Sequence, residues 1–152
     1  MSDLVWMREA YQLALTAKAA GEVPIGAILI DEHHHVLGRG WNQVLQTNDP
    51  SAHAEMVAIR EAANSVNNYR LLNTTLYVTL EPCCMCAGAL VHARIKRLVF
   101  ATRDVKAGAA GSIYNLLQGY PLNHQVQIDE GVLQQESAAL LSDFFKTRRQ
   151  GP

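Results

Sequence analysis

All three cysteines of this 152-residue chain, Cys83, Cys84 and Cys86, fall within one short stretch, EPCCMC. Side chains three positions apart on a helix lie on the same side, one turn apart, so Cys83 and Cys86 can reach a common centre. The amides and dipole at a helix N-terminus stabilise thiolates, and the thiolate is the form that binds metal. The stretch favours a metal site, although a lone C-x-x-C is also typical of a redox pair.

A second motif supplies a ligand for which a redox pair has no use. His53 and Glu55 stand in NDPSAHAEM, where Asp, Pro and Ser predict a helix that begins near Ser51. In the middle of a helix, side chains two positions apart point to nearly opposite sides. Both can reach one centre only from the first turn of a helix whose end is aimed at the site. We therefore expect two helix starts to converge on that centre.

One imidazole and two thiolates make three zinc ligands, which leaves the fourth tetrahedral position open to water, as in catalytic zinc sites. Zinc-bound water has a pKa of about 7, and a neighbouring carboxylate can take its proton. Glu55 fits that catalytic role. Cys84 is turned by about 100° from Cys83 on a helix and is poorly placed as a fourth ligand. We predict that it is a buried, small apolar residue.

A zinc-stabilised module that binds RNA or protein without catalysis is the alternative from another class. A structural zinc site normally closes its shell with a fourth Cys or His. The open position and the adjacent Glu55 therefore argue for an enzyme.

Hydrophobic periodicity predicts the elements that position these residues. Helices are expected over 2–20, from near 51, from 82 and over 132–149, and strands over 25–31, 35–41, 74–80, 97–102 and 124–131. The first two strands predict a hairpin, and 104–122 a loop with room for one short helix. In the helix from Ser51, we expect Met56, Ile59, Ala63 and Val66 to share one side. The order predicts a single domain over 1–152, with a mixed sheet covered by helices on both faces.

Charge and cysteine usage restrict the partners and the compartment. The chain has 13 Lys plus Arg against 14 Asp plus Glu, a formal net charge of −1, which argues against binding nucleic acid by bulk charge. Three basic stretches, 92–97, 103–106 and 146–149, are interpreted as solvated faces, with a local basic patch as the alternative. Clustered cysteines favour a reducing compartment. The N-terminus lacks a signal-peptide pattern, and no stretch is apolar enough to span a membrane, so we expect a cytoplasmic protein with no membrane partner.

HAE at 53–55 followed by PCCMC at 82–86 matches the H-x-E and P-C-x-x-C signature of the zinc-dependent nucleobase deaminases. Within that superfamily the chain resembles the bacterial tRNA-specific adenosine deaminases. The resemblance covers nearly the whole length, through the segments EVPIGAILI, GWNQ, DPSAHAEM, LYVTLEPCCMCAGALVHARI, RDVKAGAAGS, LNH and LLSDFFKTRR.

The resemblance implies a three-layer α/β/α fold of the cytidine-deaminase type with a central five-stranded mixed sheet. It also implies a homodimer with active sites near the subunit interface, and one Zn²⁺ per subunit held by His53, Cys83 and Cys86. Glu55 would be the catalytic proton shuttle. The implied reaction is hydrolytic deamination of adenosine to inosine at the wobble position of a tRNA anticodon stem-loop.

The resemblance further implies a set of substrate-binding residues. Asn42 would hydrogen-bond the purine beside the backbone of Ala54, and the flipped nucleotide or its neighbours would contact Asp104, Lys106, Asn123 and Phe145. Purely structural roles are the alternatives: Asn42 as a cap, Asn123 in a turn, Asp104 and Lys106 as solvated charges, and Phe145 in the core. The alternative function is a deaminase of a free base or nucleoside, of the guanine or cytosine type, which shares every zinc-site residue and which the modest net charge mildly favours.

Overall fold

The computed structural model describes residues 2–119 and 122–150. Its helices and strands follow one another as α1 (Asp3–Ala19), β1 (Gly26–Ile30), β2 (Val36–Trp41), α2 (Val44–Thr47), α3 (Ala54–Val66), β3 (Thr75–Leu80), α4 (Cys84–His92), β4 (Arg97–Thr102), β5 (Gln127–Glu130) and α5 (Gln134–Gln150).

The five strands form a single mixed sheet in the order β2-β1-β3-β4-β5. Strand β1 runs antiparallel to both β2 and β3, and the predicted β1–β2 hairpin is therefore confirmed. Strands β3, β4 and β5 are parallel to one another. Parallel neighbours need a crossover on one face of the sheet, and α4 makes that crossover between β3 and β4.

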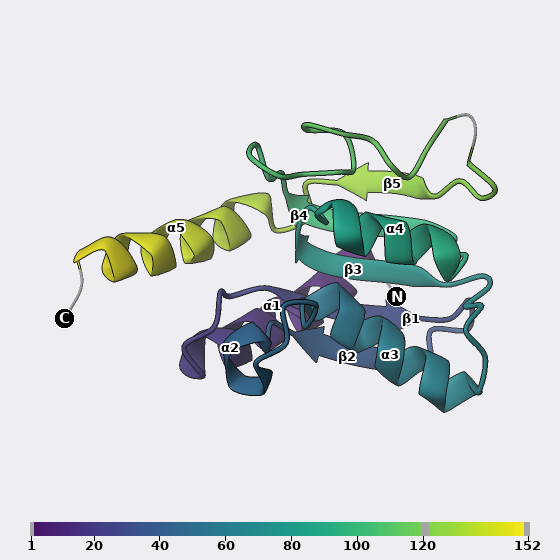
Figure 1. Cartoon of the computed structure of the whole chain (residues 1–152), viewed down its shortest axis with the longest axis horizontal. Coiled ribbons are helices and arrows are strands. Elements are labelled where there is room, and N and C mark those ends of the chain that lie inside the picture. The colour runs from purple at the N-terminus through teal and green to yellow at the C-terminus, as the bar shows by residue number, and fades with distance from the viewer. Residues whose placement is uncertain (1, 120–121, 151–152) are drawn as a thin grey trace.

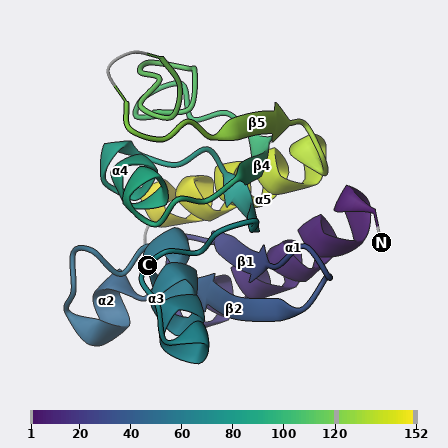
Figure 2. The same ribbon diagram turned by 90° about the vertical axis from the view of Figure 1, so that its right-hand side faces the viewer.

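Side chains of the central strands alternate between two apolar layers, which gives the three-layer α/β/α fold. Leu29, Leu76 and Leu98 are buried on the face covered by α3 and α4, together with Ala58 and Leu90 of those helices. The opposite face buries another set beneath α1, namely Ile28, Tyr77 and Val99 with Trp6, Met7 and Ala10. Figures 1 and 2 show α3 and α4 on the same side of the sheet, with α1 on the other. The predicted fold class is confirmed.

Two glycines of β2 let α3 lie directly on the strand. A Cβ atom at Gly38 would overlap the backbone of Ala58, and a Cβ at Gly40 would overlap the backbone of Ala54 and Ala58. The residues that α3 buries are accordingly small, apart from Glu55 and Ile59: Ala54, Ala58 and Ala62. Of the residues predicted to share one side of α3, Ile59 is buried and Val66, the last residue of the helix, is exposed.

Other departures from the sequence predictions lie in the connections. Helix α2 was not predicted. The described parts of the 104–122 loop, residues 104–119 and 122, contain turns and an isolated Ala110–Asn115 bridge in place of a helix. Strand β5 is shorter than the predicted 124–131 because only Gln127–Glu130 pair with β4. Within the described residues, no helix combines the length and the apolar character needed to cross a membrane.

Candidate metal centre and active site

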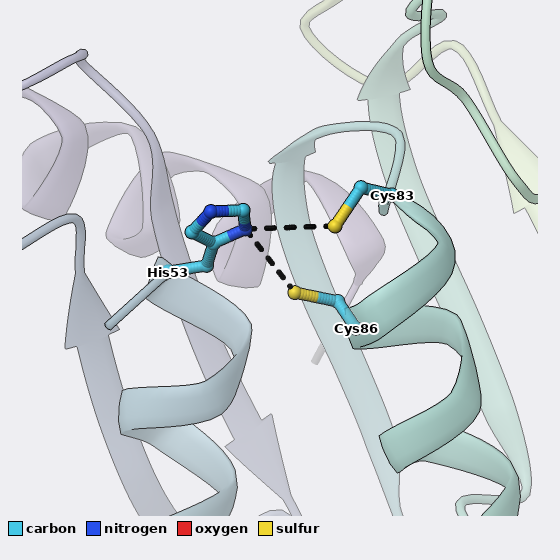
Figure 3. Close-up of side chains that lie close together, drawn as sticks. All are labelled: His53, Cys83 and Cys86. Atoms are coloured by element: carbon cyan, nitrogen blue, oxygen red, sulfur yellow. Dashed lines mark hydrogen bonds between the residues drawn. The ribbon is translucent and has the colours of Figure 1, made fainter. Parts of the chain in front are cut away.

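The N-termini of α3 and α4 converge on one point, as predicted. His53 is the N-cap residue of α3 and Cys83 is the N-cap residue of α4, both with extended backbone. Cys86 lies in the first turn of α4 and is fully buried. Figure 3 shows the imidazole of His53 pointing from α3 toward both sulfurs on α4. The sequence places the ligands on helix starts, and the shared face of the sheet brings those starts together.

The spacing of the three ligand atoms fits a zinc ion. Nδ1 of His53 lies 3.6 Å from Sγ of Cys83 and 3.5 Å from Sγ of Cys86. A tetrahedral zinc ion about 2.3 Å from each sulfur and about 2.0 Å from nitrogen sets the nitrogen about 3.5 Å from each sulfur. Among the described residues, these three form the one group of His, Cys, Asp or Glu side chains with metal-ligand spacing. The donor set therefore has both the chemistry and the dimensions of a three-ligand zinc site.

The two thiols differ in their affinity for a proton. A hydrogen bond from Cys86 lowers the pKa of Cys83 to about 3, and His53 acts in the same direction. The hydrogen bond with Cys83, together with burial, raises the pKa of Cys86. The hydrogen bond with Cys83 also raises the pKa of His53. The sulfurs and the imidazole thus compete for protons that a divalent cation would displace, since metal ligands bind deprotonated.

Glu55 lies on the first turn of α3 beside this cluster and is almost fully buried, with 4% of its surface exposed. Burial raises the pKa of its carboxyl to about 7, and the charge of Cys83 acts in the same direction. A carboxyl with a pKa near neutrality can both accept and donate a proton, which suits a general acid-base.

Cys84 corrects one prediction from the sequence. Its side chain is exposed rather than buried, and it is absent from the ligand cluster. Cys84 is the first residue of α4, whose buried face consists of Cys86, Ala87 and Leu90. The 100° rotation that keeps Cys84 away from the metal therefore turns it toward the outside of the molecule.

A cavity of about 490 Å³ opens beside His53. Asn42 lines it and is buried, and its side-chain oxygen accepts a 2.9 Å hydrogen bond from the N–H of Ala54. Asn42 therefore joins the end of β2 to the start of α3. Its amide nitrogen makes no hydrogen bond to the part of the chain that the structure describes, and this donor is available to a ligand in the cavity. The remaining lining residues are Gly21, Glu22, Val23, Val44, Leu45, Phe144, Phe145 and Arg148.

A larger groove of about 790 Å³ adjoins this cavity, because Phe145 and Arg148 line both. Asp104 and Lys106 also line the groove, and Phe145 is 45% exposed within it. Two basic stretches that were interpreted as separate solvated faces meet here, since Arg103 and Lys106 lie opposite Arg148 and Arg149 of α5 in the same lining. Their sequence separation concealed this shared surface.

Asn123 lies elsewhere. It is exposed and sits four residues before β5. The neighbouring His124 forms a hydrogen bond through its ring nitrogen with the carbonyl of Ile95, two residues before β4. The zinc cluster lies at the other end of the parallel strands, beyond the end of β3. Within one chain, Asn123 and the metal centre therefore lie at opposite ends of the parallel strands.

The fold is a mixed five-stranded sheet, and two of its covering helices begin at the same ends of the strands. These helix starts present a histidine, a C-x-x-C pair and a buried glutamate, which together define a zinc-dependent deaminase. The family model for the cytidine and deoxycytidylate deaminase zinc-binding region matches residues 1–102. The tRNA-specific adenosine deaminase of Haemophilus influenzae is 51% identical over 148 residues, covering 97% of this chain and 86% of that protein. The chain therefore belongs to the cytidine and deoxycytidylate deaminase family, and within it to the branch of the tRNA-specific adenosine deaminases.

Solved structures agree with this assignment. A structure from work on A-to-I editing by tRNA:A34 deaminases at the wobble position is 39% identical, with a TM-score of 0.86 over 90% of this chain and 98% of that one. A guanine deaminase from Nitrosomonas europaea has a TM-score of 0.84 over 96% of this chain and 86% of its own, at 22% identity. The second likeness shows the fold alone.

Proposed function

We propose that this enzyme hydrolyses adenosine to inosine at the wobble position of a tRNA anticodon. The observation that carries the proposal is the convergence of His53, Cys83 and Cys86 at zinc-ligand spacing, with Glu55 buried alongside, in a chain 51% identical to a tRNA-specific adenosine deaminase. Hydrolysis adds one water at C6 of the adenine ring and releases the amino group as ammonia.

His53, Cys83 and Cys86 would hold the zinc ion, which would lower the pKa of water toward neutrality and so supply the nucleophile. The Glu55 carboxylate takes a proton from the attacking water and delivers it to N1 of the ring. It then carries the remaining hydroxyl proton to the amino group, so that the C6–N bond breaks, ammonia leaves and C6 becomes a carbonyl. The pKa of about 7 lets one side chain perform both transfers.

The cavity and the groove divide substrate recognition between them. The free amide nitrogen of Asn42 donates to a ring nitrogen of the purine, and the Asn42–Ala54 bond holds it in that orientation. Phe145 stands between the cavity and the groove and offers a face for base stacking. Lys106 and Arg149 supply positive charge for the phosphates of the neighbouring nucleotides, and Asp104 shapes the turn that carries Lys106.

The functional unit in this proposal is a cytoplasmic homodimer with one Zn²⁺ per subunit. Exposed apolar side chains offer an interface at the start of α4 and in the loop after β4, namely Met85, Ile113, Tyr114 and Leu116. Asn123 lies at the other end of the parallel strands from the zinc cluster of its own chain, so in this proposal it contacts substrate at the site of the other subunit. Three free cysteines, two of them metal ligands, suit a reducing compartment.

Incubation of the zinc-loaded enzyme with an anticodon stem-loop carrying adenosine at the wobble position tests the proposal. The expected result is conversion to inosine with one ammonia released per stem-loop, and no product from a stem-loop with guanosine there. Parallel reactions contain free adenine, guanine, cytosine and cytidine. Ammonia from a free base or nucleoside without turnover of the stem-loop would replace this function with that of a small-molecule deaminase.

A further inference from the structure

Two carboxylates outside the zinc cluster are almost completely buried, and each is bonded to the backbone of a connecting segment beside the substrate cavity. Glu22 and Glu81 are each 2% exposed. A buried carboxylate is costly unless hydrogen-bond donors satisfy its oxygens. The donors that satisfy these two residues come from segments that line the cavity and the groove.

Glu81 precedes the zinc-binding segment, and the 104–112 loop wraps around its carboxylate. One oxygen accepts the N–H of Asp104 at 3.0 Å and the hydroxyl of Ser112. The other accepts the N–H of Ala110 at 2.9 Å and the N–H of Ser112 at 3.0 Å. A Cβ atom at Gly108 would overlap this carboxylate, so the loop approaches as closely as a glycine permits.

The loop that Glu81 holds forms one wall of the groove. Residues 103–107 line it opposite Phe145 and Arg149. The Asp104 side chain extends these hydrogen bonds toward the groove, because it accepts the N–H of Lys106 at 3.0 Å and that of Ala107 at 3.1 Å. A chain of hydrogen bonds thus runs from the buried carboxylate to the residues that face the groove.

Glu22 does the same for the cavity. Its two oxygens accept the N–H of Leu45 at 3.0 Å and the N–H of Gln46 at 2.8 Å. Val44 and Leu45 line the cavity with Asn42 and His53. Leu45 is nevertheless 62% exposed, so packing alone does not hold it in place.

We propose that Glu81 and Glu22 are positioning residues for substrate recognition, which hold the 104–112 loop and the 44–47 segment as preformed walls around the nucleotides next to the target base. Walls that are ordered before binding reduce the entropy lost when a flexible strand binds. This inference rests on the proposed function. It concerns the affinity for an extended substrate and leaves the chemical step to Glu55 and the metal.

The test compares Glu81→Gln with wild type on the anticodon stem-loop. Glutamine has the same size but turns an NH₂ group toward backbone donors, so the loop loses acceptors. A roughly tenfold rise in KM is expected, with kcat within about twofold of wild type. Zinc content should remain one per subunit, and hydrogen exchange at the amides of Asp104, Ala110 and Ser112 should accelerate. Glu22→Gln should raise KM likewise, with faster exchange at Leu45 and Gln46.

Asp31→Asn is the matched control, because Asp31 also accepts two backbone N–H groups, from His33 and His35, in the β1–β2 turn. It should leave KM unchanged. Ser112→Ala removes the hydroxyl that donates to Glu81 and introduces no new polar group that would lack a hydrogen-bond partner. It should raise KM in the same direction, which keeps the test open if Glu81→Gln does not fold.

An unchanged KM in Glu81→Gln or Ser112→Ala despite faster exchange would overturn the proposal, as would loss of zinc or a fall in kcat alone. Wild-type enzyme without activity on the stem-loop would instead refute the proposed function. The exchange measurement would still report whether Glu81 holds the loop.

Discussion

The side-chain oxygen of Asn42 accepts a 2.9 Å hydrogen bond from the backbone N–H of Ala54, the residue between His53 and Glu55. The bond ties the end of β2 that borders the cavity to the first turn of α3. It also fixes which end of the Asn42 amide faces the cavity, namely the nitrogen.

Replacing Asn42 with Ala removes both the bond to Ala54 and the donor that we propose for the purine. We expect kcat/KM on the stem-loop to fall by about 30- to 1,000-fold, in the range lost when a positioned polar contact is removed. Zinc content should be unchanged. Steady-state kinetics and metal analysis on the same sample check this, and unaltered kcat/KM would remove Asn42 from substrate binding.

Glu55→Ala should retain zinc and lose turnover. Loss of a general acid-base costs about 10²- to 10⁴-fold in rate, and the buried carboxyl of Glu55 lies beside the cluster. Glu55→Gln, which preserves the size of the side chain, should be equally inactive. Single-turnover assays with enzyme of measured zinc content are appropriate, and substantial residual deamination would assign the proton transfers to another group.

His53→Ala and Cys86→Ala should each lose the metal, because two remaining ligands do not hold zinc against a chelator. Cys84→Ala is the matched control, since its thiol is exposed and outside the cluster although it is adjacent to Cys83. Elemental analysis after dialysis against a chelator separates the two classes. A full complement of zinc in His53→Ala would contradict the ligand set.

Gly40→Ala should displace α3 from β2, because the new methyl group would overlap the backbone of Ala54 and Ala58. We expect a destabilisation of about 1–3 kcal/mol, typical of overpacking. Activity should fall as His53 and Glu55 move. Gly88→Ala is the control, since nothing lies within 4 Å of the position of its Cβ. Thermal unfolding should show a lower Tm for the first variant and an unchanged or higher Tm for the second.

Acid should weaken the link between α1 and the sheet. Hydrogen bonds from Arg97, and a further one from Tyr77, lower the pKa of Asp3 from its ordinary value of 3.8 to about 2. Because the folded pKa lies below the unfolded one, the contribution is complete above pH 3.8 and is lost as the pH falls toward 2. Asp3→Asn should therefore cost roughly 1 kcal/mol at pH 7, after allowance for solvent screening of a partly exposed pair.

Denaturant titrations of wild type and Asp3→Asn between pH 7 and pH 3 check the sign of this effect. The difference in unfolding free energy should shrink below pH 4. Glu9→Gln, at an exposed carboxylate on the same helix, should show no comparable loss. A difference that grew with acid would contradict the assignment.

Local sequence determined the chemistry of this protein and most of its elements. The spacing of Cys83 and Cys86, the His-x-Glu pair and the helix-start residues beside them predicted the ligands, and hydrophobic periodicity predicted all five strands of the sheet. These properties are local, because rotation along a helix and alternation along a strand follow from backbone geometry over a few residues.

Tertiary structure alone decided which faces are buried and what holds the connections. Alanines of α3 are buried because Gly38 and Gly40 bring the helix backbone onto β2, whereas Val66, the last residue of the helix, is exposed. The partners of Glu81 are donated from Asp104, Ala110 and Ser112, residues far along the chain that no local pattern connects to it. Cys84 is exposed for a similar reason: the sheet lies on the other side of α4. Close approach and hydrogen-bond partnership depend on distances between segments, which only the folded chain sets.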